Sequence, residues 1–404
     1  MTHRILLIRE SSSIIALVDL IRHSKYRRDM GFYSADVLMI GAGPVGLAAA
    51  IALKRTGLDV LMVDVQAPPI DKACGEGLMP GAIASLSLLG IDTESLCGIR
   101  FMGIRFSDIH SEASAAFLHG DGLGVRRVSL HQALFNYAAI LGVRFRWRTK
   151  ISMCHGEGLS LDGRTLRYRY LVGADGESSP TRAWAGFEQR ILHSRRYGFR
   201  AHFEFPYRNL EDVQGDHYVE VYWCDAGQAY VTPVRECMVC VAVTSRSKSP
   251  GIFRQIIESI PVLQRRISRA RQVTSQRGSV TTTSSLDRVA TRNIALIGDA
   301  SGSVDAITGD GLAMGFRQAI LLRDSILAGG LEQYQLKHAD ITRLPHRMAR
   351  VLLLMDRHTA LRRHLLKLFS IQPYLFRSML GIHLGEKTTY DAPSDATLTG
   401  CPMM

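Results

Sequence analysis

The sequence lacks the features that mark several protein classes. Charged residues make up only 21% of its 404 residues and aromatic residues 7%, whereas hydrophobic residues reach 46%, which excludes a disordered or fibrous chain. The seven cysteines are an odd number spread along the chain, which argues against a disulfide framework and for a reducing compartment. No second Cys-x-x-Cys pair accompanies Cys237 and Cys240, so no metal site is predicted. We expect a cytoplasmic protein.

Signals for export or for membrane insertion are also missing. Charged residues interrupt the apolar stretch at residues 1–28, and no small-residue cleavage site follows, so a signal peptide is not expected. The uncharged run from Val37 to Leu53 contains three glycines and a proline, which do not fit a spanning helix. Residues 1–32 are predicted to form an N-terminal extension, with an upstream choice of start codon as the alternative.

Acidic residues are in short supply. The sequence has 49 Lys and Arg against 37 Asp and Glu, a net charge of +12 that suits nucleic acid, an anionic membrane surface or acidic ligands. Nucleic acid is not expected, because stacking aromatics do not alternate with the basic residues and no reading motif is present.

The first motif that carries chemistry is a glycine-rich turn. A predicted buried strand, Asp36–Ile40, leads directly into it, and the helical run Leu47–Leu53 follows. The turn is built from Gly41, Gly43, Pro44, Val45 and Gly46. This order of strand, G-x-G-x-x-G and helix is that of a dinucleotide-binding unit, in which a pyrophosphate lies at the helix N-terminus. Asp64 ends the next predicted strand, Leu58–Val63, and is the expected acceptor for a ribose hydroxyl.

Two further motifs follow predicted strands. The strand Tyr168–Ala174 ends in Asp175 and Gly176, and the strand Asn293–Ile297 ends in a second glycine-rich segment. The residues of that segment that carry the motif are Gly298, Asp299, Gly309, Gly311 and Leu312. A predicted helix, residues 312–327, begins there, so its backbone amides would face a bound group.

Through these three motifs the sequence resembles the FAD-dependent oxidoreductases that include aromatic hydroxylases, geranylgeranyl reductases and flavin-dependent halogenases. The resemblance covers residues 35–327. It implies FAD as the cofactor, with the motif at Asp175 bordering the flavin and the one at Asp299 holding the ribityl and pyrophosphate part. It also implies that the second glycine-rich segment faces the pyrimidine side of the flavin. Arg127, before a predicted helix, would lie next to the adenosine or pyrophosphate, and a solvated arginine is the alternative.

The same resemblance implies the fold class and the domains. We expect an α/β protein: an FAD-binding Rossmann-like domain of the glutathione-reductase type, an antiparallel β-sheet substrate domain and C-terminal helices. The expected FAD-binding segments are 33–95, 120–185 and 285–335, and the expected substrate-sheet segments are 96–119 and 186–284. The C-terminal helical segment is expected at 336–385 and a tail at 386–404.

Some segments are similar to the geranylgeranyl reductase branch in particular. These are Asp71–Gly77 and Val304–Leu312, whereas the aromatic motif of that branch is degraded at Gln228–Pro233. By this resemblance Cys74 and Glu76 would lie near the flavin and are the candidate catalytic residues, Cys74 with a direct role in activity and Glu76 as a proton donor or substrate contact. A buried, inert cysteine is the alternative for Cys74.

Candidate substrate residues lie between the second and third motifs. Short alternating runs there predict the substrate sheet. Arg200, His202 and Tyr230 stand in these runs and are the candidate substrate-binding residues. Alternation does not reveal which face lines a pocket, so solvent-facing side chains remain the alternative.

The basic excess gathers near the C-terminus. The segment from Ile341 to Gly385 has seven Arg and one Lys against a single acid, Asp356, and its apolar and basic residues have helical spacing. One interpretation is a peripheral contact of 341–385 with the inner face of a membrane. The other is a helical layer packed on the FAD-binding domain, with a solvated arginine face.

The favoured function is an NAD(P)H- and O2-dependent monooxygenase of a hydrophobic small molecule, phenolic or polyketide-like, in secondary metabolism. No second strand-linked glycine fingerprint is present, so NAD(P)H, the expected external reductant, has no dedicated domain. The first alternative is an FAD-dependent C=C reductase of an isoprenoid or lipid substrate. The more remote alternative is a non-catalytic, flavin-binding, membrane-associated protein.

Overall fold

The computed structural model describes residues 32–154, 158–206 and 217–385. The predicted tail, and the predicted extension up to residue 31, lie outside the described residues. The chain divides into two units, the smaller being Met1–Ser34 with Ser152–Arg167 and the larger Ala35–Ile151 with Tyr168–Met404. In the smaller unit, β9 (Ser152–Cys154) pairs antiparallel with β10 (Gly158–Leu161), which pairs with the first residues of β11 (Arg164–Gly173).

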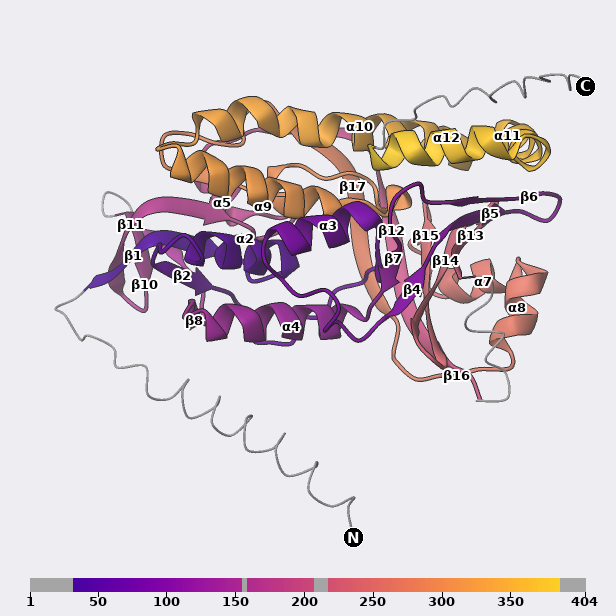
Figure 1. The fold of residues 1–404 in the computed structure, drawn as a ribbon, viewed down its shortest axis with the longest axis horizontal. Helices are drawn as coiled ribbons and strands as arrows, with labels where there is room; N and C mark the ends of the chain where they lie inside the picture. The colour runs from indigo at the N-terminus through magenta and orange to yellow at the C-terminus, as the bar shows by residue number, and fades with distance from the viewer. Residues whose placement is uncertain (1–31, 155–157, 207–216, 386–404) are drawn as a thin grey trace, which may run out of the picture. The chain divides into compact units, whose positions relative to one another are not determined.

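A parallel sheet supports the glycine motifs in the larger unit (Figure 1). Its strands in sheet order are β8 (Arg144–Arg146), β2 (Val60–Val63), β1 (Phe32–Ile40) and β11, with β18 (Ile294–Leu296) beside β11. Every residue of β2 is buried, as expected for a parallel strand that is covered on both faces. The strands end at the predicted motifs, so the carboxyl edge of this sheet collects all three.

Helices cover this sheet. They are α2 (Pro44–Lys54), α3 (Pro80–Leu88), α4 (Arg127–Ile140) and α9 (Gly311–Leu327). The helix predicted after the glycine turn is confirmed as α2, which starts at Pro44, where a missing N–H costs nothing. It packs so closely on α9 that a Cβ at Gly315 would lie 2.2 Å from a methyl of Val45. Only glycine permits this approach of the two helices.

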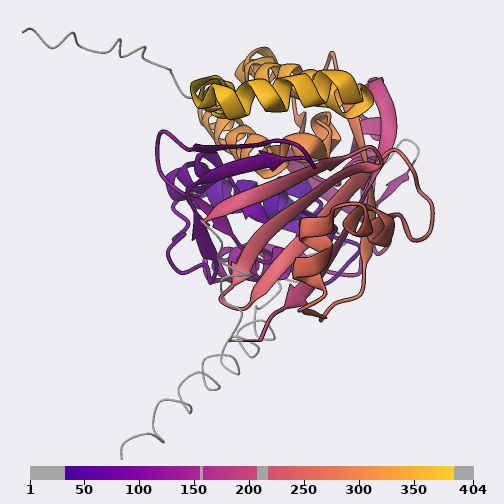
Figure 2. The ribbon, with the colours of Figure 1, turned by 90° about the vertical axis from the view of Figure 1, so that its right-hand side faces the viewer.

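A second, larger sheet forms the other layer (Figure 2). Its order is β16 (Arg271–Gln272), β12 (Gln189–Glu204), β15 (Met238–Ser245), β14 (Gly227–Arg235), β13 (Tyr218–Cys224), β5 (Gly103–Ser107) and β6 (Glu112–Ala116), with β17 (Arg277–Leu286) also paired to β12. The strands β12, β15, β14 and β13 pair antiparallel in turn, as do β5 and β6, whereas β13 pairs parallel with β5. Helices α7 (Ile252–Glu258) and α8 (Pro261–Ile267) add apolar residues to its core.

A small sheet joins the two layers. It consists of β3 (Gly77–Leu78), β7 (Gly122–Gly124) and β4 (Ile99–Phe101). A Cβ at Gly124 would lie 1.8 Å from the carbonyl oxygen of Pro233 on β14, so the backbones touch there. The loop that contains Cys74 and Glu76 is thereby held against the larger sheet.

The C-terminal helices form one layer with the end of α9. They are α10 (Glu332–Arg357), α11 (Thr359–Ile371) and α12 (Pro373–Leu384), and α11 and α12 pack on β6. Within the described ranges, none of the helices combines the length and the apolar character needed to cross a bilayer. The predicted α/β architecture, with a parallel-sheet domain, a mostly antiparallel sheet layer and C-terminal helices, is confirmed.

A buried histidine ties α10 to the third motif. The amide of Gln318 donates to Nε2 of His338 at 3.1 Å, and its carbonyl oxygen accepts from the backbone N–H of Gly298 at 2.7 Å. Burial, helped by His346, lowers the pKa of His338 from 6.5 to about 4. Near neutral pH the His338 ring is therefore uncharged in the folded protein.

We expect acid to weaken the fold through this residue. Below pH 6.5 the unfolded chain binds a proton at His338 that the folded chain refuses, so stability falls between about pH 6.5 and 4, by on the order of 3 kcal/mol. His338→Gln, which cannot titrate, should lose less stability than the wild type between pH 7 and 4.5 in urea unfolding. Equal losses in both proteins would contradict this assignment.

Candidate functional site

The glycine turn has the backbone geometry that the motif requires. Gly41 has φ +103°, and a Cβ there would lie 2.3 Å from the carbonyl oxygen of Ala174. A Cβ at Gly46 would lie 2.2 Å from the Gly41 carbonyl oxygen. Beside Gly43, by contrast, the nearest atom is a guanidinium nitrogen of Arg127 at 4.0 Å. The first and third glycines are therefore needed for packing, and the second leaves open space at the N-terminus of α2.

Arg127 faces this open space. It begins α4, and its Nε is buried without a hydrogen-bond partner among the described residues. A half-buried arginine whose Nε lacks an acceptor, beside a glycine turn at a helix N-terminus, fits a pyrophosphate group, which would supply the missing acceptor. These residues fit the pyrophosphate of FAD, and Arg127, Gly43 and the first turn of α2 would hold its phosphates.

Asp64 lies at the end of β2, next to the turn. Its Oδ2 accepts the N–H of Ala42 at 2.7 Å and its Oδ1 accepts that of Gln66 at 2.7 Å. The carboxylate thus stays at the edge of the site, half-buried, with lone pairs left for a ribose hydroxyl. His131, which the sequence analysis missed, bonds the Ala42 carbonyl oxygen through Nε2 at 2.8 Å, and burial lowers its pKa.

The motif after β18 lies against the glycine turn. The side chain of Val45 would be 3.5 Å from a Cβ placed on Gly298. Asp299 pairs with the ammonium group of Lys72 at 3.1 Å, both side chains being about half exposed. This ion pair joins the loop after β2 to the third motif, at the place where the resemblance puts the ribityl chain.

The second half of that motif forms a tight turn. A 3-10 helix, Ala306–Thr308, leads into Gly309 with φ +69°, and α9 begins at Gly311. A Cβ at Gly311 would meet no atom within 4 Å, so the amide end of α9 faces open space. Leu312 is half-buried behind it. Burial raises the pKa of Asp310 in this turn, although Arg317, at 3.1 Å, and His383 oppose the shift.

Asp175 shapes its own turn. Its Oδ2 accepts from the backbone N–H of Thr181 at 2.9 Å and from its hydroxyl at 2.7 Å, and its Oδ1 accepts from Ser179. Arg182 then donates to the carbonyl oxygens of Glu177 and Ala300, at 2.6 and 3.2 Å. The carboxylate therefore fixes the loop that adjoins the third motif.

Glu76 is the centre of a buried polar cluster. Its Oε1 accepts the backbone N–H of Arg127 at 3.0 Å, and its Oε2 lies 2.7 Å from Nε2 of His202. The Nδ1 of His202 lies 2.9 Å from the hydroxyl of Thr274. Arg200, also buried, pairs with Asp71 of the same loop. The two β12 candidates, Arg200 and His202, thus contact the loop that carries Glu76.

Cys74 and Cys240 adjoin this cluster. The backbone N–H of Glu76 donates to the Cys74 sulfur at 3.3 Å, and the Cys240 thiol donates to the Cys74 carbonyl oxygen at 3.6 Å. Ligand atoms of Glu76, His202 and Cys240 lie within 4.8 Å of one another, a set of types that can hold a metal. Burial, with Glu76 nearby, raises the pKa of Cys240, which keeps it a thiol rather than the thiolate that metals prefer. We interpret the cluster as a set of hydrogen bonds that connects the Glu76 loop to the larger sheet.

An apolar cavity of about 60 Å³ adjoins Gly309. Its walls include Phe106, Val221, Ile307, Leu352, Phe376 and Met379. Its polar members are Thr308, Tyr230 and His383. The hydroxyl of Tyr230 donates to the Ile307 carbonyl oxygen at 3.3 Å, and Nε2 of His383 lies 3.1 Å from the Thr308 carbonyl oxygen. The Nδ1 of His383 is buried without a partner among the described residues.

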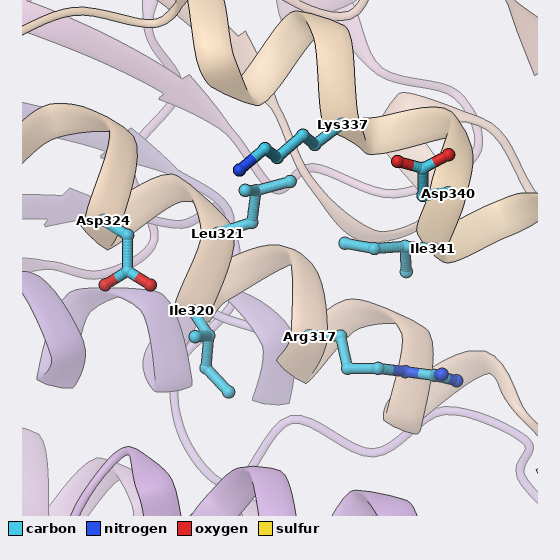
Figure 3. A pocket seen from close by; sticks show the side chains of 7 residues that line it. All are labelled: Arg317, Ile320, Leu321, Asp324, Lys337, Asp340 and Ile341. Atoms are coloured by element: carbon cyan, nitrogen blue, oxygen red, sulfur yellow. The ribbon is translucent and has the colours of Figure 1, made fainter. Parts of the chain in front are cut away.

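A second hollow, of about 310 Å³, lies between α9 and α10 (Figure 3). Its lining residues are Arg317, Ile320, Leu321, Asp324, Lys337, Asp340 and Ile341. Asp324, Lys337 and Asp340 are exposed, and Arg317 already pairs with Asp310. The hollow is larger than the apolar cavity, but its charges are solvated or paired, so we assign it no ligand.

Sequence reasoning also missed a buried ion network. Nη1 of Arg196 donates to Asp305 at 2.7 Å, and Nη2 donates to Gln228 at 2.5 Å. The amide of Gln228 in turn donates to Asp356 on α10, also at 2.5 Å. Only the alternation of β12 hinted at an inward arginine, because the partners lie 32 to 128 residues apart in the chain.

Arg127→Gln is expected to weaken FAD binding about tenfold to a hundredfold, because charge-assisted hydrogen bonds contribute about 1.5–3 kcal/mol each. Flavin fluorescence during titration of the FAD-free protein would measure this. Arg323→Gln, on α9 but paired only with its neighbour Asp324, is the matched control. Unchanged affinity in Arg127→Gln would place that guanidinium outside the cofactor site.

Known proteins resemble this chain in sequence and in fold. The family described as FAD binding domain matches residues 34–329. Menaquinone reductase from Mycobacterium tuberculosis is 30% identical over 318 residues, which are 72% of this chain and 77% of that protein. Digeranylgeranylglycerophospholipid reductase 1 from Methanothermobacter thermautotrophicus is 25% identical over 338 residues, 76% of this chain and 79% of that protein.

A solved structure shares the architecture. The crystal structure of p-nitrophenol 4-monooxygenase from Pseudomonas putida matches with a TM-score of 0.73 at 14% identity, covering 88% of this chain and 98% of that chain. At this identity the likeness concerns the fold alone. The family match over residues 34–329 agrees with the glycine turn and the site around Arg127. The chain belongs to the FAD binding domain family and is an FAD-dependent oxidoreductase.

Proposed function

We propose that this protein is a reductase that adds two hydrogens to a double bond of a hydrophobic, isoprenoid-like substrate, with NAD(P)H as the external reductant. The observation that carries the proposal is the 30% identity to menaquinone reductase over 72% of the chain. The digeranylgeranylglycerophospholipid reductases also match, and both names denote reductases of isoprenoid lipids. The sequence analysis favoured oxygenation, and these relatives move the preference to its first alternative.

The apolar cavity beside Gly309 supports a hydrophobic substrate. Its walls are aliphatic and aromatic, and the polar groups of Tyr230 and His383 bond to backbone carbonyl oxygens of the adjacent turn. Such a wall gains free energy by excluding water from a hydrocarbon chain. No lysine or arginine is among the residues that line it, so it offers no permanent cation to a carboxylate or phosphate.

FAD, when bound and reduced by NAD(P)H, would supply the hydride, and the chain would have to supply the proton. His383 is the residue of the cavity suited to this. Nε2 donates to the Thr308 carbonyl oxygen, so Nδ1 is the ring atom without a hydrogen-bond partner among the described residues, and it is the atom from which we propose that the proton is delivered. The Asp310 carboxyl interacts electrostatically with His383 and also pairs with Arg317 at 3.1 Å. The burial of the cavity excludes water from the reacting carbon atoms.

Oxygenation remains the second candidate. The p-nitrophenol 4-monooxygenase has the same fold, and a closed apolar cavity would suit either chemistry. The two candidates differ in what they consume, because reduction needs only the external reductant, whereas oxygenation also needs O2.

The proposal is tested by product mass. Purified protein with FAD and NADPH or NADH, incubated without oxygen with menaquinone or a geranylgeranyl lipid, should give a product two hydrogens heavier by mass spectrometry. A product that forms only in air and carries an added oxygen atom would instead establish the monooxygenase. Failure of both reactions with every isoprenoid substrate would reject the proposed substrate class.

His383→Gln is expected to lower the turnover rate about 10²- to 10⁴-fold, the usual contribution of a positioned proton donor. Its FAD content should stay at the wild-type level. His364→Gln, on an exposed position of α11, is the matched control and should keep full activity. If His383→Gln changes only the KM for substrate, the residue shapes the cavity and does not donate the proton.

A further inference from the structure

The outer side of α10 carries a basic stripe, Arg343, Arg347, Arg350 and Arg357. These residues are all exposed and recur at intervals of three, four or seven, so they share one face of the helix. Arg343 pairs with Asp340 at 3.4 Å. In the part of the chain that the structure describes, the other three have no acidic partner. Three of the four positive charges of the stripe, those of Arg347, Arg350 and Arg357, are therefore not compensated by an acid of the described residues.

The next helix, α11, carries an apolar stripe of Leu361, Leu368 and Ile371. Their exposed fractions are 40%, 43% and 62%. They lie on the side of the helix opposite Leu366 and Phe369, which are buried against the body of the protein. On α12, Tyr374 and Ile382 are 57% and 50% exposed at helical spacing. Exposed leucine, isoleucine and tyrosine at this density cost free energy in water unless something covers them.

Negative charge is sparse on this surface, where the exposed Asp340 pairs with Arg343 and the exposed Asp225 pairs with Arg362. The one acid between residues 341 and 385, Asp356, is buried and bonded to Gln228. Arg362, by contrast, faces inward and pairs with Asp225, so it adds nothing to the outer face. What remains outside is positive and apolar, which is complementary to an anionic lipid surface in both charge and polarity.

We propose that the outer face of α10–α12, made by the basic stripe and the apolar stripe with Tyr374 and Ile382, rests on an anionic bilayer. Figures 1 and 2 both show these three helices together along one side. Their inner sides supply Leu352, Phe376 and Met379 to the apolar cavity. A lipid that leaves the bilayer would thus cross a single layer of helices to reach the cavity. The inference does not depend on which reaction follows.

The test is flotation of the full-length, FAD-loaded protein with lipid vesicles. Vesicles that contain phosphatidylglycerol should carry the protein upward, and pure phosphatidylcholine vesicles should not. Raising the salt concentration should release the protein, since the attraction between exposed charges and the lipid surface is screened. Equal binding to both vesicle types, or no binding to either, would overturn the proposal.

Two sets of variants separate charge from apolar contact. Arg347→Gln/Arg350→Gln/Arg357→Gln should weaken binding about a hundredfold, given about fivefold for each basic residue near an anionic surface. Lys248→Gln/Arg265→Gln/Arg292→Gln removes the same charge from exposed positions outside the face and should bind as the wild type does. Equal losses in the two sets would mean that net charge alone is responsible and would overturn the proposed face.

Leu368→Ser/Ile371→Ser should also reduce vesicle binding, whereas Leu88→Ser/Ile140→Ser, at other exposed apolar positions, should not. All variants should keep the FAD absorption spectrum and their activity on a water-soluble substrate analogue, so a failure of the proposed reaction would not be confused with a failure of membrane binding. If lipid-free protein forms a dimer that Leu368→Ser/Ile371→Ser dissociates, and vesicles bind neither form, a second copy covers this face and the proposal is wrong.

Discussion

One buried guanidinium, that of Arg196, holds together the parts on which the cavity depends. It bonds to Asp305 directly and reaches Asp356 through Gln228, so a strand of the large sheet, the turn before α9 and helix α10 meet at a single charge. A buried charge is tolerable only while its partners stay in place, and removing one partner typically costs about 3–5 kcal/mol. Asp305 also accepts the N–H of Ile307, which fixes the turn that leads to Gly309. The hydrogen bonds of Arg196 therefore help to fix the turn that forms part of the cavity wall.

The buried carboxylate of Glu76 likewise connects two parts of the structure, the N-terminus of α4 and the larger sheet. Its φ of +61° is unusual for a residue with a side chain, and it brings the carboxylate between the first turn of α4 and His202 of the large sheet. A carboxylate at a helix N-terminus is stabilised by the helix dipole, and here it also orients the backbone that carries Arg127. The N-terminus of α4 and the larger sheet are thus joined through one acid, so a shift of either would act on the other.

The parts that sequence could predict are those encoded by residues close together in the chain. The turn from Gly41 to Gly46, the strand before it and the helix after it form a local pattern with a steric reason for each glycine, and all of it is found. The partners of Arg196 could not be predicted, because alternation in a strand tells that a side chain points inward but not what it meets. Arg200, His202 and Tyr230 were the candidate substrate-binding residues, but the fold places Tyr230 in the wall of the apolar cavity and Arg200 and His202 against the Glu76 loop instead. His383 carried no motif, and a lone histidine on an apolar helix is usually a satisfied core residue.

The size of the cavity determines how a substrate can enter. A volume of about 60 Å³ holds one or two water molecules, which is far less than a prenyl unit needs. Part of the wall must therefore move when a substrate binds, and methionines 348 and 379, with their unbranched, adaptable side chains, stand where α10 and α12 meet it. Substrate binding and product release would then require α10 and α12 to move away from the larger sheet, and such a step can be slower than the chemical reaction. Turnover would in that case follow the viscosity of the medium and the mobility of α12 rather than the reactivity of the double bond.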